Sequence, residues 1–294
     1  ARLKKLIVKE LKEDMALYGD DRRSPIVARG EAKAMSETDL ISADPVTVVI
    51  STKGWARAAK GHEIDPASLN YKSGDEYKAS ALGKSNQPVI LICSSGRSYS
   101  IPAHTLPSAR GQGEPLTGRL SPPSGATFDG VLMGEESQRY LMASDAGYGF
   151  VMKLGDAITK NKNGKALINL PKGARVLQPK LITKLDTDYL VAVTNEGRML
   201  LFPLAELPEL ARGKGNKIIG IPGARVAERE EFVIDVETIG EKDTLVIYAG
   251  KRHINLKHSD LEHYFGERGR RGNKLPRGFQ KVDRIDIKRK EPKS

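Results

Sequence analysis

The sequence predicts an all-β protein in which five small sheets form a propeller-like ring, with a short helix before the first sheet. Three observations support this prediction. One pattern of apolar run, glycine-containing turn and alternating run recurs five times. The turn glycines, Gly54, Gly96, Gly147, Gly197 and Gly250, lie 42, 51, 50 and 53 residues apart, close to the roughly 40 to 50 residues of a four-stranded blade. Basic, glycine-rich loops recur between the copies.

The N-terminal segment ARLKKLIVKELKEDMALYGDDRRSPI is predicted to be a helix that ends before the breakers Gly19 and Pro25. Four apolar residues share one helical face: Leu3, Leu6, Ile7 and Leu11. Charged side chains are too dense here for a signal peptide, and no run of about 18 apolar residues occurs in the sequence. We therefore expect a cytoplasmic protein.

Each of the five copies is predicted to fold as a β-hairpin. The copies are VISTKGWARAAKGHEI, LICSSGRSYSIPAHTL, MASDAGYGFVMKLGDA, AVTNEGRMLLFPLAEL and VIYAGKRHINLKHSDL. Glycine supplies the positive φ that a tight turn requires. One blade cannot bury both faces alone, so the repetition predicts stacked blades. The single cysteine, Cys93, lies in an apolar run, which predicts a core residue and a reducing compartment.

The loops after the last four copies mix basic residues with glycines: ARGQGEPLTGRL, TKNKNGKALINL, ARGKGNKIIGI and GERGRRGNKLPRGF. Backbone amides beside Arg and Lys suit phosphate oxygens, and loops that recur once per blade would form a charged belt along one rim. The formal net charge of +11 and the pI near 9.5 favour a polyanionic partner. Several phosphate contacts could offset the about 1 to 6 kcal/mol that bending a duplex costs.

Two segments carry a family resemblance. ETDLISADPVTVVISTKGWARA, residues 37–58, resembles the entry to the first blade in the C-terminal domains of bacterial type IIA topoisomerase A subunits. SSGRSYSIPAHTLPSARGQGEP, residues 94–115, resembles their second blade and the loop after it. The resemblance runs through all five repeats. It is closest to the topoisomerase IV A subunits of gamma-proteobacteria, with gyrase A subunits as more distant relatives.

The resemblance implies a five-bladed β-pinwheel, closed or gapped, whose blades exchange strands and whose basic rim binds and bends duplex DNA without reading its sequence. Gyrase relatives wrap DNA with a box of the form QRRGGKG after the first hairpin. Here GHEIDPASLNYKSGDEYKASAL occupies that place, with only Lys72, Ser73 and Gly74 faintly similar. Because the box is absent, we expect a topoisomerase IV role: the domain helps present DNA crossings for ATP-dependent decatenation and relaxation of supercoils in chromosome segregation.

The resemblance also places the DNA-cleaving tyrosine in a domain upstream of the N-terminal helix. We therefore expect no catalytic residue, metal or cofactor in this chain, with Mg and ATP used elsewhere in the holoenzyme. The implied partners are double-stranded DNA and the topoisomerase IV B subunit, which would join through the upstream domain in an A2B2 heterotetramer. Chromosome-organising proteins are candidate partners, and the implied location is cytoplasmic and chromosome-associated.

Three parts are expected along the chain. Residues 1–27 would form a helix and linker leaving the DNA-cleaving domain, residues 28–287 the pinwheel of about five repeats, and residues 288–294 a basic tail. Two other functions stay open: gyrase-type DNA wrapping, and a propeller scaffold that binds an acidic protein.

Basic residues of the hairpins and loops are the candidate DNA phosphate contacts, although any one of them could be a solvated surface residue. They are Arg57, Lys60, Arg97, Arg110, Lys153, Lys160, Lys162, Lys165, Arg198, Arg212, Lys214, Lys217, Lys251, Arg252, Arg268, Arg270, Arg271 and Lys274. His253, His258 and His263 recur at a spacing that suits neither one helical face nor a metalloprotease motif, so metal ligation is not expected.

Overall fold

The computed structural model describes residues 2–20, 24 and 41–290, and the chain divides into two compact units, Ala1–Glu37 and Thr38–Ser294. The first unit contains the predicted helix, α1 (Arg2–Tyr18), none of whose residues is buried. The helix ends where the Gly19 amide donates to the Met15 carbonyl at 3.0 Å. Pro25 and the expected boundary after residue 27 lie outside the described residues.

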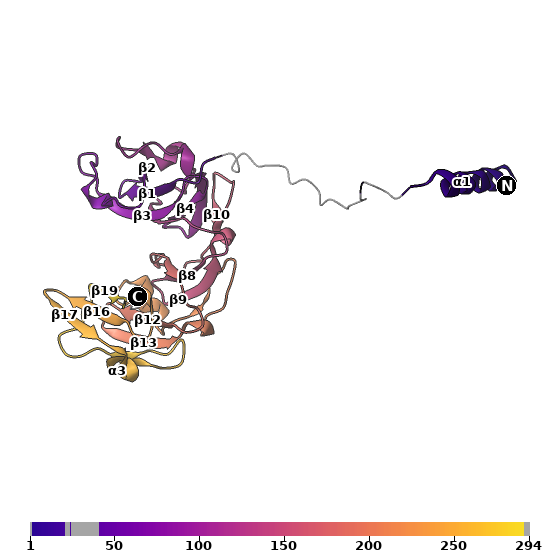
Figure 1. Ribbon diagram of the computed structural model, residues 1–294. Helices are drawn as coiled ribbons and strands as arrows, with labels where there is room; N and C mark the ends of the chain where they lie inside the picture. The colour runs from indigo at the N-terminus through magenta and orange to yellow at the C-terminus, as the bar shows by residue number, and fades with distance from the viewer. Residues whose placement is uncertain (1, 21–23, 25–40, 291–294) are drawn as a thin grey trace. The chain divides into compact units, whose positions relative to one another are not determined.

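The described part of the second unit, residues 41–290, consists of five small antiparallel sheets, as the repeats predict (Figure 1). In spatial order, the first sheet contains β3 (Tyr77–Lys84), β1 (Pro45–Ser51), β2 (Trp55–Lys60) and β6 (Glu114–Pro115). The second contains β7 (Phe128–Leu132), β4 (Pro88–Cys93), β5 (Arg97–Pro102) and β10 (Lys165–Ala166). The third contains β11 (Lys180–Ile182), β8 (Arg139–Ser144), β9 (Tyr148–Lys153) and β14 (Asn216–Lys217).

The fourth sheet contains β15 (Val233–Ile239), β12 (Tyr189–Thr194), β13 (Arg198–Pro203) and β18 (Asn273–Lys274). The fifth contains β19 (Arg284–Lys288), β16 (Thr244–Ala249) and β17 (Arg252–Leu256). Short helical turns connect the strands: η2 (Pro66–Ser68), η3 (Ala103–Thr105), η4 (Leu116–Gly118), η5 (Leu154–Ala157), η6 (Leu204–Glu206), α2 (Gly223–Ala227), α3 (His258–Leu261) and η7 (Glu262–Tyr264). None of the described helices is long and apolar enough to cross a membrane.

The fourth strand of each four-stranded sheet comes from the next repeat. β6 follows the second hairpin, yet it pairs with β2 of the first sheet, with Trp55 opposite Pro115 and Ala56 opposite Glu114. β10, β14 and β18 join the second, third and fourth sheets in the same way, by pairing with β5, β9 and β13. The expected strand exchange is confirmed. We call these four two-residue strands the exchanged strands.

A glycine with positive φ precedes every exchanged strand: Gly113 (89°), Gly164 (71°), Gly215 (76°) and Gly272 (71°). A Cβ at Gly215 would lie 2.3 Å from the carbonyl oxygen of Gly149 in the receiving strand. Only glycine fits both this backbone conformation and this close approach. The sequence-based interpretation assigned the loop glycines to phosphate binding. The structure instead gives one glycine of each loop, the one directly before the exchanged strand, a role in strand exchange.

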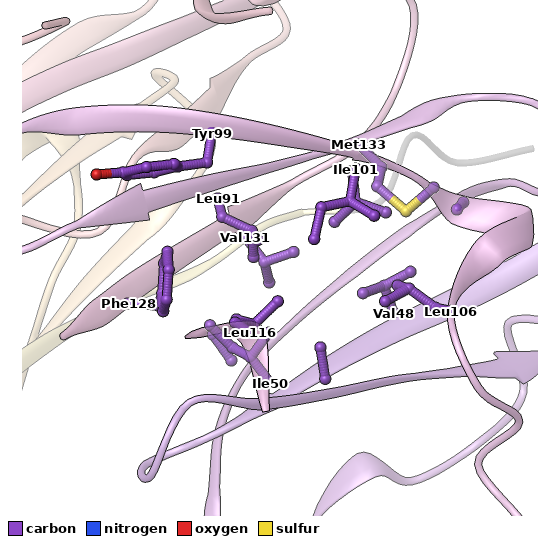
Figure 2. Packing of buried hydrophobic residues seen from close by; sticks show 14 of the residues in the cluster. Val48, Ile50, Leu91, Tyr99, Ile101, Leu106, Leu116, Phe128, Val131 and Met133 are labelled. Atoms are coloured by element: carbon purple, nitrogen blue, oxygen red, sulfur yellow. The ribbon is translucent and has the colours of Figure 1, made fainter. Parts of the chain in front are cut away.

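The residue after each exchanged strand anchors it in two ways. Its aliphatic side chain is buried, and its amide donates to the carbonyl of the hairpin-turn glycine. The four pairs are Leu116 to Gly54 (2.9 Å), Leu167 to Gly96 (3.0 Å), Ile218 to Gly147 (2.7 Å) and Leu275 to Gly197 (2.8 Å). The turn glycines all have the predicted positive φ. Figure 2 shows Leu116 among Ile50, Leu91 and Val131, in the core between the first two sheets.

The inner hairpin strands bury both of their faces. In β4, Leu91 and Cys93 face the core shared with the first sheet, while Ile90 and Ile92 face the core shared with the third. β8 and β12 alternate in the same way between neighbouring cores. Successive sheets are thus joined by continuous apolar packing, and the prediction of a core position for Cys93 is confirmed.

The last sheet extends further than the sequence suggests. β19 runs to Lys288, and the Arg289 guanidinium donates to the Thr238 carbonyl at 3.3 Å. Part of the segment expected to be a basic tail from residue 288 therefore packs against the fourth repeat, while residues 291–294 lie outside the described part of the chain.

A largely buried ion-pair cluster links the outer strands of the third and fourth sheets. The Lys180 ammonium lies 2.9 Å from Asp235 Oδ2 and 2.5 Å from Glu237 Oε1. Burial opposes the charge on Lys180, but the two carboxylates outweigh it and raise the pKa of the ammonium. Burial raises the pKa of Asp235 and of Glu237 above their ordinary values. Lys180 is thus the counter-charge that lets two carboxylates stay in this junction.

We expect Gly215→Ala to lower the free energy of unfolding by about 1–3 kcal/mol more than Gly125→Ala. Both glycines have nearly the same φ, 76° and 77°, so both substitutions incur the left-handed backbone strain. Only at Gly215 would the new Cβ collide with a backbone oxygen, because nothing lies within 4 Å of a Cβ at Gly125. Urea unfolding of the two variants measures the difference, and equal losses would contradict the proposed reason for the glycine.

Lys180→Met is expected to lower the free energy of unfolding by about 2–4 kcal/mol at pH 7, because two partly desolvated carboxylates lose their counter-charge. Without the ammonium, the pKa values of Asp235 and Glu237 rise further in the folded state. A raised carboxyl pKa contributes stability at low pH that is lost as the pH rises through it, so the deficit should shrink from pH 7 toward pH 4.

Urea unfolding at several pH values tests this prediction. Lys184→Met, at an exposed lysine, is the control and should change stability by no more than about 0.5 kcal/mol. A Lys180→Met deficit that stays constant or grows toward low pH would show that the cluster does not act as described.

Candidate nucleic-acid interface

The loops that carry the exchanged strands lie against one another. We call residues 109–121, 160–169, 211–220 and 267–275 together the exchange belt. The Ser121 amide donates to the Lys162 carbonyl at 2.8 Å, and the Gly213 amide donates to the Leu167 carbonyl at 2.9 Å. The Gly220 amide likewise donates to the Arg270 carbonyl at 2.8 Å. Consecutive loops are therefore connected by backbone hydrogen bonds into one continuous strip.

Many of the sequence-predicted candidates in the exchange belt are exposed and have no carboxylate within 4 Å among the described residues. They are Arg110, Lys160, Lys162, Arg212, Lys214, Lys217 and Lys274. Because their loops are fixed by strand exchange, these cations line the same strip. An array of unpaired cations on a rigid backbone suits contacts with a repeating polyanion.

Each basic loop lies one sheet earlier than the sequence alone suggests. Lys214 and Lys217 belong to the fourth repeat, but their loop pairs with β9 of the third sheet. The Lys214 ammonium sits 3.9 Å from the centroid of the Tyr148 ring. The sequence reasoning missed Tyr148, although it occupies the same place after a turn glycine as Trp55, whose ring carries the Lys72 ammonium at 3.3 Å.

Arg57 is not a surface residue, so the structure removes it from the candidate phosphate contacts. Its side chain is 3% exposed, and its guanidinium donates to the carbonyls of Asn70 (2.7 Å) and Gly111 (2.9 Å). It also stacks on Tyr71, 4.5 Å from the ring centroid. A guanidinium that is buried and bound by backbone carbonyls in this way holds loops together and is not available to phosphate.

Two further arginine candidates clamp exchanged loops. Arg97 donates to the carbonyls of Asn163 (2.8 Å) and Gly164 (2.9 Å), and Arg198 donates to the Gly272 carbonyl (3.1 Å). Both are the first residue after a hairpin turn and both are partly buried. Their positive charge therefore stabilises the loop backbone, and their contribution to phosphate binding is secondary to that role.

Arg271 also has a structural role. Its guanidinium forms two hydrogen bonds to the carboxylate of Glu231, whose side chain is fully buried, and donates to the Gly220 carbonyl at 2.9 Å. Arg225 pairs with the same carboxylate at 2.8 Å. This buried ion pair fastens the loop of the fifth repeat to the fourth.

The remaining candidates in or near the exchange belt form weaker hydrogen bonds and ion pairs with the rest of the chain. Lys153 pairs with Glu209 at 3.0 Å, and hydrogen bonds from Arg139 and Lys153 lower the pKa of that carboxyl. Lys165 and Arg268 donate to the carbonyls of Asp156 and Lys217, while Arg270 forms an exposed pair with Glu267. These side chains can exchange such surface contacts for phosphate at little cost. Lys60, Lys251 and Arg252 are exposed but lie outside the exchange belt.

The sequence reasoning also missed Arg119. With Lys160 and Lys162, it lines a hollow of about 390 Å³ at the junction of two exchanged loops. The Arg119 guanidinium pairs with Glu114 at 2.7 Å and donates to Thr105. Among the described residues, no three His, Cys, Asp or Glu side chains lie together in a group that could hold a metal ion.

Comparison with known proteins places this arrangement in a family. The family described as "DNA gyrase C-terminal domain, beta-propeller" matches residues 138–182 and 188–239. The solved "Structure of the E. coli ParC C-terminal domain" is 53% identical, with a TM-score of 0.77, over 84% of this chain and 99% of that one. The chain belongs to the family of C-terminal domains of topoisomerase IV A subunits.

Full-length relatives agree with this assignment. The A subunit of DNA topoisomerase 4 from Pseudomonas aeruginosa is 61% identical over 97% of this chain, and that from Escherichia coli K12 is 53% identical over 97%. The chain spans 38% of the length of each. The solved "Structure of DNA gyrase A C-terminal domain" shares the fold, with a TM-score of 0.58 at 14% identity. The predicted family and its pinwheel fold are therefore confirmed for this topoisomerase IV domain.

Substitutions of the adjacent Arg270 and Arg271 test which of the two side chains stabilises the fold and which is a surface residue. We expect Arg271→Ala to lower the free energy of unfolding by about 2–4 kcal/mol, because the buried Glu231 carboxylate loses one of its two partners. Arg270→Ala should cost no more than about 0.5 kcal/mol, since its pair with Glu267 is exposed. Chemical denaturation measures the free energy of unfolding of both variants. Similar small losses of stability would show that Arg271 is a surface cation without a structural role.

Proposed function

We propose that this chain binds duplex DNA through the exchange belt, without reading base sequence, and bends the duplex along it. The observation that carries the proposal is the continuity of the belt. Four loops from four repeats are joined edge to edge, and each presents at least one exposed cation that has no carboxylate partner in the described structure. Spaced phosphate contacts along such a strip can offset the about 1 to 6 kcal/mol needed to bend a duplex.

The absence of an obvious reading element supports sequence independence. In the globular unit, the described α-helices are α2, with five residues, and α3, with four. Neither is long enough to lie along a major groove and present several side chains to base edges. The exposed candidates are Lys and Arg on loops, which suit phosphate oxygens on any sequence.

We further propose that the parent protein is the A subunit of an ATP-dependent type IIA topoisomerase that works with a B subunit in decatenation and supercoil relaxation. The full-length relatives, which are A subunits of DNA topoisomerase 4, support this. In that setting this chain supplies no catalytic group and helps present DNA crossings to the cleaving domain during chromosome segregation.

Gyrase-type wrapping has less support. The segment that stands where gyrases carry their basic box folds back onto the first sheet: Gly61 accepts a hydrogen bond from Thr47 at 2.7 Å, and Asn70 accepts one from Arg57 at 2.7 Å. Lys72, the one lysine or arginine in residues 61–76, rests on the Trp55 ring. This segment covers the first sheet and presents no run of free cations.

A triple substitution tests the proposal. Arg212→Ala, Lys214→Ala and Lys217→Ala together should weaken binding to duplexes of unrelated sequence by similar factors. The slope of log affinity against log salt should become shallower by up to about 2.7, at about 0.9 for each lost phosphate contact. Fluorescence anisotropy at several salt concentrations measures both quantities.

The matched control is Lys84→Ala, Lys184→Ala and Lys242→Ala, which removes the same charge from exposed lysines outside the exchange belt. This control should leave the slope nearly unchanged. Equal effects of the two triples would mean that net charge alone attracts DNA, and a loss confined to one sequence would contradict sequence independence. A chain that binds no duplex would favour the alternative of an acidic protein partner.

A further inference from the structure

We propose that the free edge of β17 is an acceptor for a strand supplied by a partner protein, namely an extended acidic segment of the form Gly-x-x-Leu or Gly-x-x-Ile. This inference concerns a second surface and does not rest on DNA binding. It follows from the regularity of the strand exchange, which four sheets complete and the fifth does not.

β17 stands where the receiving strands of the other sheets stand. In the third sheet, Tyr148 lies opposite Ser144 and pairs on its other side with the exchanged Lys217. In the fifth sheet, Arg252 lies opposite Ala249, across a turn that is one residue shorter. Within residues 41–290, no strand pairs with the other side of β17. An unpaired edge presents free backbone donors and acceptors to an incoming strand.

Arg252 repeats a side chain that already holds exchanged loops elsewhere. Arg97, Arg198 and Arg252 are the first residues of β5, β13 and β17. Arg97 donates to the Gly164 carbonyl at 2.9 Å, and Arg198 donates to the Gly272 carbonyl at 3.1 Å. Arg252 is exposed. The fifth sheet therefore carries the same guanidinium in the position that binds the carbonyls of an incoming loop.

The turn beside Arg252 borders an open hollow of about 460 Å³. In the third and fourth sheets, a Cβ on the turn glycine Gly147 or Gly197 would lie 2.5 Å or 2.6 Å from backbone atoms of the neighbouring segment. A Cβ on Gly250, which also has positive φ, would meet nothing within 4 Å. The space that the following segment fills beside these two turns is open here.

The charge around the hollow indicates the occupant. Lys251, Arg252 and Lys281 line it with a single acid, Asp283, so an acidic segment is favoured. The chain itself contains an exchanged segment of this kind, Gly-Glu-Pro-Leu at residues 113–116. A second copy of the chain is a weaker candidate, because all four exchanged strands are already paired within their own molecule. Addition of a strand to a free sheet edge is an established mode of peptide recognition.

The test is a titration of the isotopically labelled chain with the synthetic peptide Gly-Gln-Gly-Glu-Pro-Leu-Thr-Gly, the sequence of residues 111–118. We expect saturable NMR shifts of the amides of residues 250–256 and antiparallel cross-strand contacts. Arg252→Ala should weaken binding roughly tenfold or more, the expected loss for hydrogen bonds to a charged group. Lys242→Ala, at an exposed lysine outside the hollow, should leave it unchanged.

A control peptide with alanine in place of the second glycine, which corresponds to Gly113, should bind more weakly, because a Cβ at Gly113 would lie 2.5 Å from the Ala56 carbonyl oxygen. The proposal is overturned if the peptide causes no shifts, if the shifts lie away from β17, or if Arg252→Ala binds as well as the parent chain. It is also overturned if a 12-bp duplex shifts the same amides at lower concentration, or if these amides shift with chain concentration as the chain dimerises.

Discussion

Asn216 and Lys217 form a strand of only two residues, yet the arrangement of the third and fourth repeats depends on their pairing with β9. The pairing brings Ile218 into the core between the two sheets and places its amide on the Gly147 carbonyl. Backbone pairing, a buried aliphatic side chain and a turn glycine thus act together at one point. The same combination recurs in the first, second and fourth sheets, so each repeat is completed by the next.

This constraint also determines what the basic side chains can do. Because the loops arrive in the receiving sheet in an extended conformation, some of their carbonyls must be satisfied by donors from that sheet, and Arg97 and Arg198 supply them. Arg271 is drawn into the buried pair with Glu231. The remaining cations, such as Lys162 and Arg212, project from a backbone that is already fixed. A fixed array loses less conformational entropy on meeting phosphates than flexible loops would.

The sequence was sufficient to predict the repeats, the hairpins and the positive-φ turn glycines, because period-two apolar runs and turn chemistry are local signals. It could not predict the two-residue exchanged strands, since Lys165–Ala166 is too short to carry a periodic pattern. It also could not separate Arg57 from Arg212. Both follow small residues in basic stretches, and only the distant Asn70 and Gly111 carbonyls make the first a buried structural side chain. The double use of glycine, for exchange as well as turns, likewise depends on contacts between repeats.

The central claim is that strand exchange builds one DNA-binding strip, and lysine footprinting tests it most directly. The chain would be acetylated with and without a duplex of about 30 bp, and the protected lysines identified by mass spectrometry. We expect protection of Lys160, Lys162, Lys214, Lys217 and Lys274 across three consecutive loops, with Lys84, Lys184 and Lys242 modified equally in both samples. Protection of the second group, or of one isolated loop, would contradict it.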